Sequence, residues 1–390
     1  MKTLKDLNIE NKKVLLRCDF NVPLKDGEIT DDTRIVSSLK TIKYIMDKNA
    51  KLIIFSHLGR VKEEADLEAN NLLPVAKRLE ELLGKEVIFS ETTRGLEEKI
   101  DNMNYGDILL VQNTRYEDLD GKKESGNDPE LGAYWASLGD VFVNDAFGTL
   151  HRAHASNVGI ASHMEGKSCF GFLVEEELTA LQVLDNPERP FMVVLGGAKV
   201  ADKIGLIDNL AKKADKIIIG GGMSYTFLKA MDKNIGKSLL DEESIDFCKE
   251  VLSKYNDKIV LPIDAAVTNE YTEDEEYRVK DIDDLTDDEM GLDIGPKTVE
   301  LFNNTLSEAK TVIWNGPLGV YEFEKYRKGT EEVLLGLVDN NIKTILGGGD
   351  VVAAASACNL KDKVYHACTG GGATLEYLEG KVLPGIDCIK

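Results

Sequence analysis

The chain has 390 residues, of which 43% are hydrophobic and 30% are charged, and its formal net charge is −22 at pH 7. This length exceeds what one hydrophobic core usually supports, so two domains are expected. The acidic charge argues against partners such as nucleic acids and anionic membranes, which attract basic surfaces.

Short β-rich apolar runs alternate with amphipathic helical segments along the chain. This pattern predicts the α/β class, with two Rossmann-like lobes that each contain a mostly parallel sheet flanked by helices. In the first half, apolar runs at 14–16, 52–55, 108–111 and 141–143 lead to polar or cationic residues. These residues are Asp19 and Asn21, His57 and Arg60, Asn113 and Arg115, and Asn144, Asp145 and Arg152.

Arginine is concentrated in this first half, since seven of the ten arginines lie at or before Arg152. Ligands of open parallel sheets bind outside the carboxyl ends of the strands, and the planar arginine fork suits a small anion there. Any one of these arginines taken alone could equally form a surface salt bridge.

Two helices are predicted around the middle of the first half and at its end. An apolar stripe over 72–83 predicts a helix that stops at Gly84. Residues 175–184 begin with three glutamates, which favour a helix N-terminus, and Pro187 and Pro190 follow. We therefore place the domain boundary between about residues 171 and 190, with this helix as a stiff connection.

In the second half, similar runs end at glycines. The runs at 192–195, 217–219, 312–314 and 344–346 lead to Gly196-Gly197, Gly220-Gly221-Gly222, Asn315-Gly316-Pro317 and Gly347-Gly348-Gly349-Asp350. Glycine turns allow backbone N–H groups to surround a polyphosphate. The first half thus presents charged side chains at its strand ends, and the second half presents bare backbone. Together they suggest phosphoryl transfer between two lobes.

No standard nucleotide motif accounts for these glycines. Gly236-Lys237-Ser238 resembles the end of a P-loop, but Met231 occupies the position of its first glycine, and no G-x-G-x-x-G follows a strand. Lys199 and Lys203 are four residues apart after Gly196-Gly197, so in a helix that opened there both would project from one face, beside a bound anion. They could also be solvated surface lysines. Asp350 can hold a hard divalent cation, although a plain strand–helix turn would explain its sequence equally well.

The chain resembles phosphoglycerate kinase over nearly its whole length. The similar motifs are Arg17–Leu24, Ser56–Arg60, Gly148–His154, Gly196–Val200, Trp314–Pro317, Gly347–Asp350 and Thr369–Ala373. The resemblance implies a cytoplasmic, glycolytic enzyme that moves a phosphoryl group reversibly between 1,3-bisphosphoglycerate with MgADP and 3-phosphoglycerate with MgATP. Its lobes would span 1–170 and 190–367, joined by a connecting helix and hinge at 171–189, and residues 368–390 would return to the first lobe.

The motif match also implies a role for individual residues. Those that would hold 3-phosphoglycerate are Asp19, Asn21, Arg34, His57, Leu58, Gly59, Arg60, Arg115 and Arg152. Those that would hold the nucleotide are Gly197, Lys199, Lys203, Gly291, Asn315, Glu322, Gly348, Gly349, Asp350 and Val351. Asp350 would also contact Mg²⁺, and Arg34 and Lys199 would stabilise the moving phosphoryl group.

The expected mechanism needs no general base, because the acceptor is a carboxylate that is already ionised at pH 7. His57 is therefore assigned to binding, or else to a core position, and His151, His154 and His163 to structural roles. Hinge closure would exclude water, which otherwise competes as the acceptor. Two residues depart from the family: Val351 replaces a usual Ser or Thr, which predicts weaker phosphate contacts, and Cys368 replaces a usual Ser, which puts a hinge hydrogen bond in doubt.

Two other functions fit part of the pattern. A non-catalytic binding protein for a phosphorylated acid would use the arginines and glycines but leave Lys199 and Asp350 without a purpose. A nicotinamide-dependent dehydrogenase is disfavoured by the missing G-x-G-x-x-G. No apolar run reaches about 18 residues, and the charged N-terminus lacks an apolar core region, so neither a membrane span nor a signal peptide is expected. The six cysteines form no C-x-x-C pair and are expected to be free, largely buried thiols; without coiled-coil heptads a monomer is expected.

Overall fold

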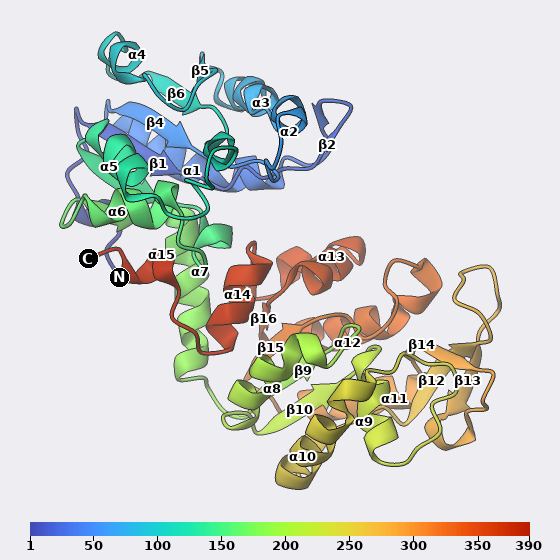
Figure 1. Cartoon of the computed structure of the whole chain (residues 1–390). Helices are drawn as coiled ribbons and strands as arrows, with labels where there is room; N and C mark the ends of the chain where they lie inside the picture. The colour runs from blue at the N-terminus through green and yellow to red at the C-terminus, as the bar shows by residue number, and fades with distance from the viewer. The chain divides into compact units, whose positions relative to one another are not determined.

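The computed structural model describes residues 1–390, which form two compact units (Figure 1). The first unit comprises Met1–Thr179 and Val382–Lys390, and the second comprises Ala180–Lys381. The first boundary falls within the α-helix that the three glutamates predict. The second boundary is later than residue 368, the predicted start of the returning segment, because helix α14 (Gly371–Leu378) packs on α8 (Ile204–Ala211) within the second unit.

The first unit is built on a six-stranded parallel sheet with the order β5-β6-β4-β1-β7-β8. Its strands are β1 (Lys13–Arg17), β4 (Lys51–Phe55), β5 (Ile88–Ser90), β6 (Ile108–Val111), β7 (Val141–Asn144) and β8 (Ser168–Phe170). A small hairpin is formed by β2 (Leu24–Lys25) and β3 (Glu28–Ile29). The helices are α1 (Thr33–Asp47), α2 (Ala65–Ala69), α3 (Leu73–Leu83), α4 (Glu97–Asp101), α5 (Pro129–Ser137), α6 (Ile160–Ser162) and α15 (Pro384–Asp387), with the start of α7 (Phe172–Gln182).

Alternating strand residues of this sheet enter two separate cores. Leu16 and Ile54 pack in one core with residues of α1 and α3, whereas Leu15 and Ile53 pack in the other with Trp135 of α5. Both faces of the sheet are therefore covered, as is usual for parallel sheets. The last residues of the chain join this unit: the Gly385 N–H donates to the Leu150 carbonyl at 2.8 Å.

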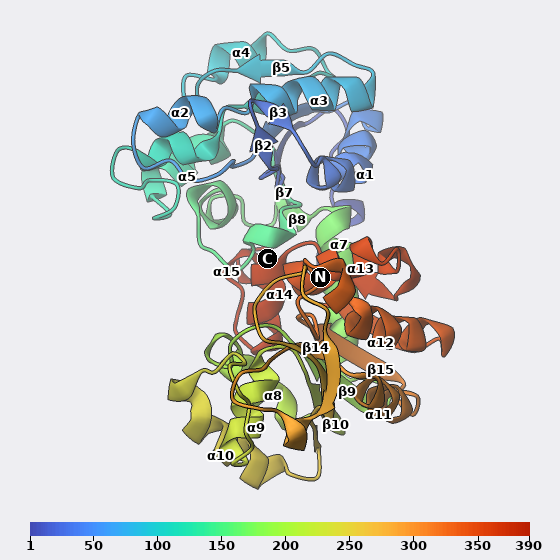
Figure 2. The ribbon, with the colours of Figure 1, turned by 90° about the vertical axis from the view of Figure 1, so that its right-hand side faces the viewer.

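The second unit has a six-stranded parallel sheet with the order β11-β10-β9-β15-β16-β17. Its strands are β9 (Phe191–Leu195), β10 (Lys216–Ile219), β11 (Ile259–Val260), β15 (Thr311–Asn315), β16 (Lys343–Leu346) and β17 (His366–Ala367). The other helices are α9 (Met223–Ala230), α10 (Ile245–Tyr255), α11 (Pro296–Leu306), α12 (Lys328–Asp339) and α13 (Gly349–Ala357). In Figure 2, α8, α9 and α10 lie on one side of β9 and β15, and α11 and α12 on the other.

A separate antiparallel sheet, which the sequence pattern did not predict, adds to the second unit. It has the order β13-β12-β14, from β12 (Asp264–Thr268), β13 (Arg278–Asp281) and β14 (Met290–Ile294). The acidic segment at 281–290 lies mostly in a 3₁₀ turn (Ile282–Asp284) and a loop between β13 and β14, and only its end residues, Asp281 and Met290, belong to strands. One of its acids, Glu289, is 3% exposed and forms ion pairs with Arg278 and Lys280.

The structure confirms the predicted strands and most helix positions. All eight apolar runs form strands of the two parallel sheets, and α3 ends at Gly84 in the left-handed conformation, with a φ of 61°. Helix α7 begins three residues before the predicted start at Glu175, because the buried Asp145 carboxylate accepts the N–H groups of Leu173 and Val174. All six cysteines are free, and four of them are buried. No helix has both the length and the apolar character required to cross a membrane.

Candidate functional site

The carboxyl ends of β1, β4, β6 and β7 form one edge of the first sheet, called here the first carboxyl edge. Strand β1 lies between β4 and β7, so the strand order reverses there. Such a reversal opens a crevice in which α/β proteins bind their ligands. The polar residues after these four strands consequently come together although they are far apart in the sequence.

Asp19 lies at the centre of this edge. Its carboxylate accepts a hydrogen bond from Arg34 Nη1 at 2.5 Å, and its other oxygen is 4.0 Å from His57 Nδ1. Burial opposes ionisation of Asp19, but His57, Arg34 and Arg17 favour it, and the net effect lowers its pKa. Burial, together with Arg17, Arg115 and Arg34, lowers the pKa of His57 to about 3. At neutral pH the edge therefore holds an ionised aspartate and a neutral histidine.

Two asparagines hold the neighbouring loops in place. Asn21 Oδ1 accepts the Gly59 N–H at 2.8 Å, and Asn113 Oδ1 accepts the N–H groups of Leu58 and Arg115 at 3.1 and 3.0 Å. Gly59 adopts the left-handed conformation with a φ of 58°, and a Cβ there would lie 2.0 Å from Asn70 Oδ1. These bonds join the loops after β1, β4 and β6 into one rigid surface.

The remaining predicted arginines differ in exposure. Arg115 is buried, with Nη1 bonded to Asp118 at 2.9 Å, while its Nε has no hydrogen-bond partner. Arg60 and Arg152 are exposed, and Arg152 Nε donates to His151 Nε2 at 3.1 Å. The predicted substrate-binding residues of this half thus lie in the loops that follow the strands of the first carboxyl edge. The exception is Arg34, which lies at the start of α1.

A buried polar layer that the sequence pattern did not predict lies beneath this edge. It consists of Arg17, Glu124 and Ser156, each 0% exposed, with His154 beside them. One signal was available: Arg17 is a charged residue that ends an apolar strand, where a buried charge needs a partner. The partner itself, more than a hundred residues away, carries no local sequence signal.

The carboxyl ends of β9, β10, β15 and β16 form the second carboxyl edge, and here main chain packs against main chain. A Cβ on Gly196 would lie 2.0 Å from the Pro317 carbonyl oxygen, and one on Gly221 would lie 2.7 Å from the Gly197 nitrogen. The Gly221 N–H donates to the Leu318 carbonyl at 3.0 Å. Glycine is required at these positions because no side chain fits between the loops.

A cavity of about 350 Å³ opens beside these loops. Its walls include four of the predicted nucleotide residues, namely Gly197, Gly291, Glu322 and Asp350. The sequence pattern did not predict the apolar and aromatic walls of the cavity, which include Tyr225, Leu239, Pro262, Tyr271, Met290 and Val320. A Cβ on Gly291 would lie 1.6 Å from the Tyr225 hydroxyl oxygen, so the glycine makes room for that ring. A cavity with one polar rim and apolar walls suits a planar base attached to phosphates.

The two candidate lysines occupy different environments. Lys199 is exposed in a loop, whereas Lys203 ends a 3₁₀ turn (Ala201–Lys203) and donates to Asn315 Oδ1. The α-helix begins only at Ile204, so the expectation that both lysines project from one helix face is wrong. Burial lowers the pKa of Lys203, while Asp350 and Asp202 act to raise it.

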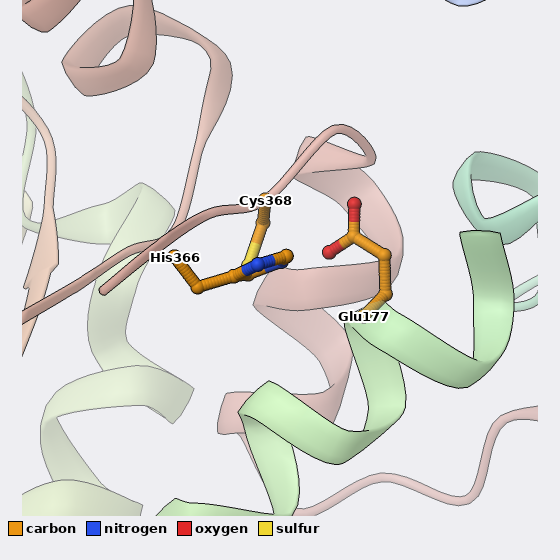
Figure 3. Close-up of side chains that lie close together, drawn as sticks. All are labelled: Glu177, His366 and Cys368. Carbon is orange, nitrogen blue, oxygen red and sulfur yellow. The ribbon is translucent and has the colours of Figure 1, made fainter. Parts of the chain in front are cut away.

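The loop after β16 places the other predicted nucleotide residues. Asn315 Nδ2 donates to the Gly347 carbonyl, and Gly348 has a φ of 128°, which favours glycine. Asp350 is exposed in the first turn of α13. Val351 is 0% exposed and packs in the core, so the structure does not bring this residue to the cavity. Cys368, drawn with His366 in Figure 3, follows β17 and is buried.

Comparisons with known proteins agree with this geometry. The family model for phosphoglycerate kinase matches residues 4–381. The chain belongs to the phosphoglycerate kinase family. It is 56% identical over 393 residues to the phosphoglycerate kinase of Fusobacterium nucleatum, covering 100% of this chain and 99% of that protein. It is 57% identical over 392 residues to that of Listeria innocua, covering 100% and 98%.

Solved structures of the family share the whole fold. The phosphoglycerate kinase structure from Coxiella burnetii has a TM-score of 0.91 and 39% identity, covering 99% of this chain and 98% of that chain. The structure from Pyrococcus horikoshii has a TM-score of 0.85 and 30% identity, covering 100% and 98%. Both units of the chain therefore have the family fold, as the sequence resemblance implied.

Proposed function

We propose that this chain is a phosphoglycerate kinase that transfers a phosphoryl group reversibly between 1,3-bisphosphoglycerate with MgADP and 3-phosphoglycerate with MgATP. The observation that carries this proposal is the family match, which includes both carboxyl edges in one uninterrupted chain. The first edge supplies cationic side chains for an acid, and the second supplies glycine loops and a cavity for a nucleotide.

The first unit binds 3-phosphoglycerate in this proposal. Arg34, Arg60, Arg115 and Arg152 pair with its anionic groups, and Asp19 orients Arg34 or accepts the substrate hydroxyl. His57 binds rather than transfers a proton, since a pKa of about 3 makes it a weak proton acceptor at physiological pH. The acceptor carboxylate is already ionised, so no base is required.

The second unit binds the nucleotide, with the base in the cavity and the phosphates over the glycine loops. The backbone N–H groups at the start of α13 favour anionic phosphates. Asp350 offers an exposed carboxylate at the rim of this cavity, which fits a hard cation such as Mg²⁺ that keeps most of its water ligands. A magnesium ion there would neutralise phosphate charge.

Charge stabilisation supplies the catalysis. Transfer of a phosphoryl group passes through a loose transition state that needs positioning and positive charge more than covalent chemistry. Arg34 and Lys199 provide that charge, and residues 171–189 act as the hinge for closure when both substrates are bound. Solution scattering tests closure: the radius of gyration should fall only with both ligands present, and unchanged dimensions would refute it.

A coupled assay with ATP, Mg²⁺ and 3-phosphoglycerate tests the reaction. Turnover that requires all three components is expected. Binding without turnover would favour the non-catalytic binding protein, and an absorbance change with NAD would favour the dehydrogenase. We further expect a cytoplasmic monomer, and a mass near 43.0 kDa by light scattering would support the monomer.

A further inference from the structure

Glu124 is a fully buried carboxylate under the first carboxyl edge, with no assigned role in the reaction proposed above. Ser156 bonds to both of its oxygens: the backbone N–H donates to Oε2 at 2.9 Å, and the hydroxyl donates to Oε1. The Glu124 carbonyl also accepts the Ala155 N–H at 2.9 Å. The side chain is therefore held in one orientation.

Arg17 is the cation that this carboxylate neutralises. Its Nε donates to Ser156 Oγ at 2.7 Å, its Nη1 donates to the Cys18 carbonyl, and its Nη2 is 3.8 Å from Glu124 Oε1. Removing one member of a buried ion pair leaves an uncompensated charge and is strongly destabilising. Glu124 and Ser156 thus determine where the Arg17 guanidinium lies.

The position of Arg17 in turn decides which nitrogen of His57 carries the proton. Arg17 Nη2 lies 3.4 Å from His57 Nδ1. A guanidinium nitrogen is always a donor, so Nδ1 must be the acceptor and the neutral ring must be protonated at Nε2. The Asp19 oxygen is 4.0 Å from Nδ1, too far to accept a hydrogen bond from it.

We propose that Glu124 is a positioning residue for the acid substrate: through Ser156 and Arg17 it holds His57 in the Nε2-protonated form. His57 then presents one neutral N–H donor, while the arginines provide the charge. Glu124 acts two links from the ligand and does not touch it. This inference rests on the proposed function for the identity of the ligand, but the hydrogen-bond chain itself does not.

His154 is the other titratable group against Glu124, with Nδ1 3.9 Å from Oε1. Burial, together with Arg115 and Arg17, lowers the pKa of His154 to about 2, so this ring is also neutral. It therefore cannot replace Glu124 or compensate Arg17. The acceptors of the Arg17 hydrogen bonds, Ser156 Oγ and the Cys18 carbonyl, are neutral, so Glu124 is its ion-pair partner, with Asp19 as a further negative charge nearby.

The test is Glu124→Gln, a substitution that removes the negative charge of the carboxylate and keeps the size and shape of the side chain. The tautomer of His57 is read from long-range ¹H–¹⁵N NMR spectra of ligand-free protein, and steady-state kinetics give KM for each substrate. We expect the wild type to show the Nε2-protonated form and the variant a mixture of tautomers. KM for 3-phosphoglycerate should rise by about tenfold or more, since a displaced bond to a charged ligand is lost. KM for MgATP should stay within about twofold.

Two further variants make the result specific. Glu289→Gln is the matched control, because it also neutralises a buried carboxylate that has ion-pair partners, here Arg278 and Lys280, but in the second unit. It should leave the His57 tautomer and KM for 3-phosphoglycerate unchanged. Ser156→Ala keeps the carboxylate but removes the hydroxyl between it and Arg17, and it should shift the tautomer in the same direction if Glu124→Gln does not fold.

Several results would overturn the proposal. One is a wild-type His57 protonated at Nδ1. Another is a folded Glu124→Gln variant with an unchanged His57 tautomer and an unchanged KM, which would make Glu124 a structural counter-ion only. A wild-type chain without kinase activity would refute the proposed function instead, and the NMR comparison would still decide the hydrogen-bond chain, because it does not depend on turnover.

Discussion

The two carboxyl edges use different parts of the polypeptide. At the first edge, charged side chains follow the strand ends, and a buried layer of Arg17, Glu124 and Ser156 lies beneath them. At the second edge, glycine loops pack so closely that a Cβ would overlap neighbouring carbonyls. A small acid with fixed charges is recognised by directed side chains, whereas backbone N–H groups suit phosphates, whose oxygens accept from many directions.

This difference predicts how each edge fails. A side-chain edge should lose function through a single lost charge while the fold survives. A backbone edge should lose stability when a side chain is introduced, because the loops themselves must move. The exception at the second edge is Lys199, an exposed side chain that the proposed mechanism uses for catalysis.

Lys199→Ala is expected to have the largest effect. Removing a cation that stabilises a moving phosphoryl group should lower kcat by on the order of 10³-fold, with a much smaller change in nucleotide KM. Steady-state kinetics in both directions would measure this, with Lys212→Ala as the control at another exposed lysine. Equal losses in kcat and in nucleotide binding would instead identify Lys199 as a binding residue.

Each unit also buries an aspartate whose pKa is raised to neutrality or above, and these two groups allow the units to be compared by pH. Burial raises the pKa of Asp145 to about 7 and that of Asp293 to about 8. Asp145 Oδ1 accepts the N–H groups of Leu173 and Val174, and Asp293 accepts those of Ile294 and Gly329. These bonds favour the ionised form, but burial outweighs them.

The sign of the pH effect follows from these shifts. A carboxyl group with a raised pKa favours the folded state below its unfolded pKa of about 4, and this contribution is lost as pH rises to the folded pKa. Compared with Asp145→Asn, the wild type should lose about 1.4 kcal/mol of unfolding free energy per pH unit between about 4 and 7. Compared with Asp293→Asn, the wild type should continue to lose unfolding free energy up to about pH 8.

Urea unfolding of the wild type and both variants across this range would measure the effect. The asparagine side chains keep an oxygen acceptor. In plots of unfolding free energy against pH, a constant offset between wild type and variant therefore reports a changed hydrogen bond. Only a difference in slope reports titration of the aspartate. Parallel curves for the wild type and a variant would mean that the carboxyl group has an ordinary pKa in the folded protein.

The backbone character of the second edge can be tested with two glycines of similar conformation. Gly221 and Gly84 have φ values of 64° and 61°, but a Cβ on Gly221 would meet three backbone atoms within 3 Å, while Gly84 has open space. Gly84→Ala should cost only the left-handed strain of about 1–2 kcal/mol. Gly221→Ala should cost about 1–3 kcal/mol more, because the loops are overpacked. Equal losses in thermal unfolding would show that the loops can separate freely.

Much of the fold was predictable because it depends on local pattern. The eight apolar runs identify eight of the twelve strands of the two parallel sheets, and the stripe before Gly84 identifies α3. The parts that were not predictable depend on distant partners. Helix α7 begins early because Asp145 caps it, and Arg17 can be buried because Glu124 neutralises it. In both cases the residues around one partner do not identify the other.

The site shows the same division. Residues at strand ends, such as Asp19, His57 and Asn315, were predictable because the ends of parallel strands meet at one edge. The apolar walls of the cavity were not, since Tyr225 and Tyr271 come from α9 and from a loop after β12. Helical spacing of Lys199 and Lys203 was misleading, because a 3₁₀ turn delays the start of α8 until Ile204.

Val351→Thr should have the smallest effect. It tests whether a side-chain hydroxyl at this residue, or only the backbone, matters for binding the nucleotide phosphates. The sequence comparison predicts that the missing hydroxyl weakens phosphate contacts. The structure gives Val351 no exposure and places it in the first turn of α13, in the core of the second unit, so an added hydroxyl would lie in that core. Nucleotide KM should therefore stay within about twofold, and stability should fall by about 1 kcal/mol as a polar group enters the core. If KM instead fell severalfold in the threonine variant, this turn would rotate when the nucleotide binds, and the second carboxyl edge would use a side chain after all.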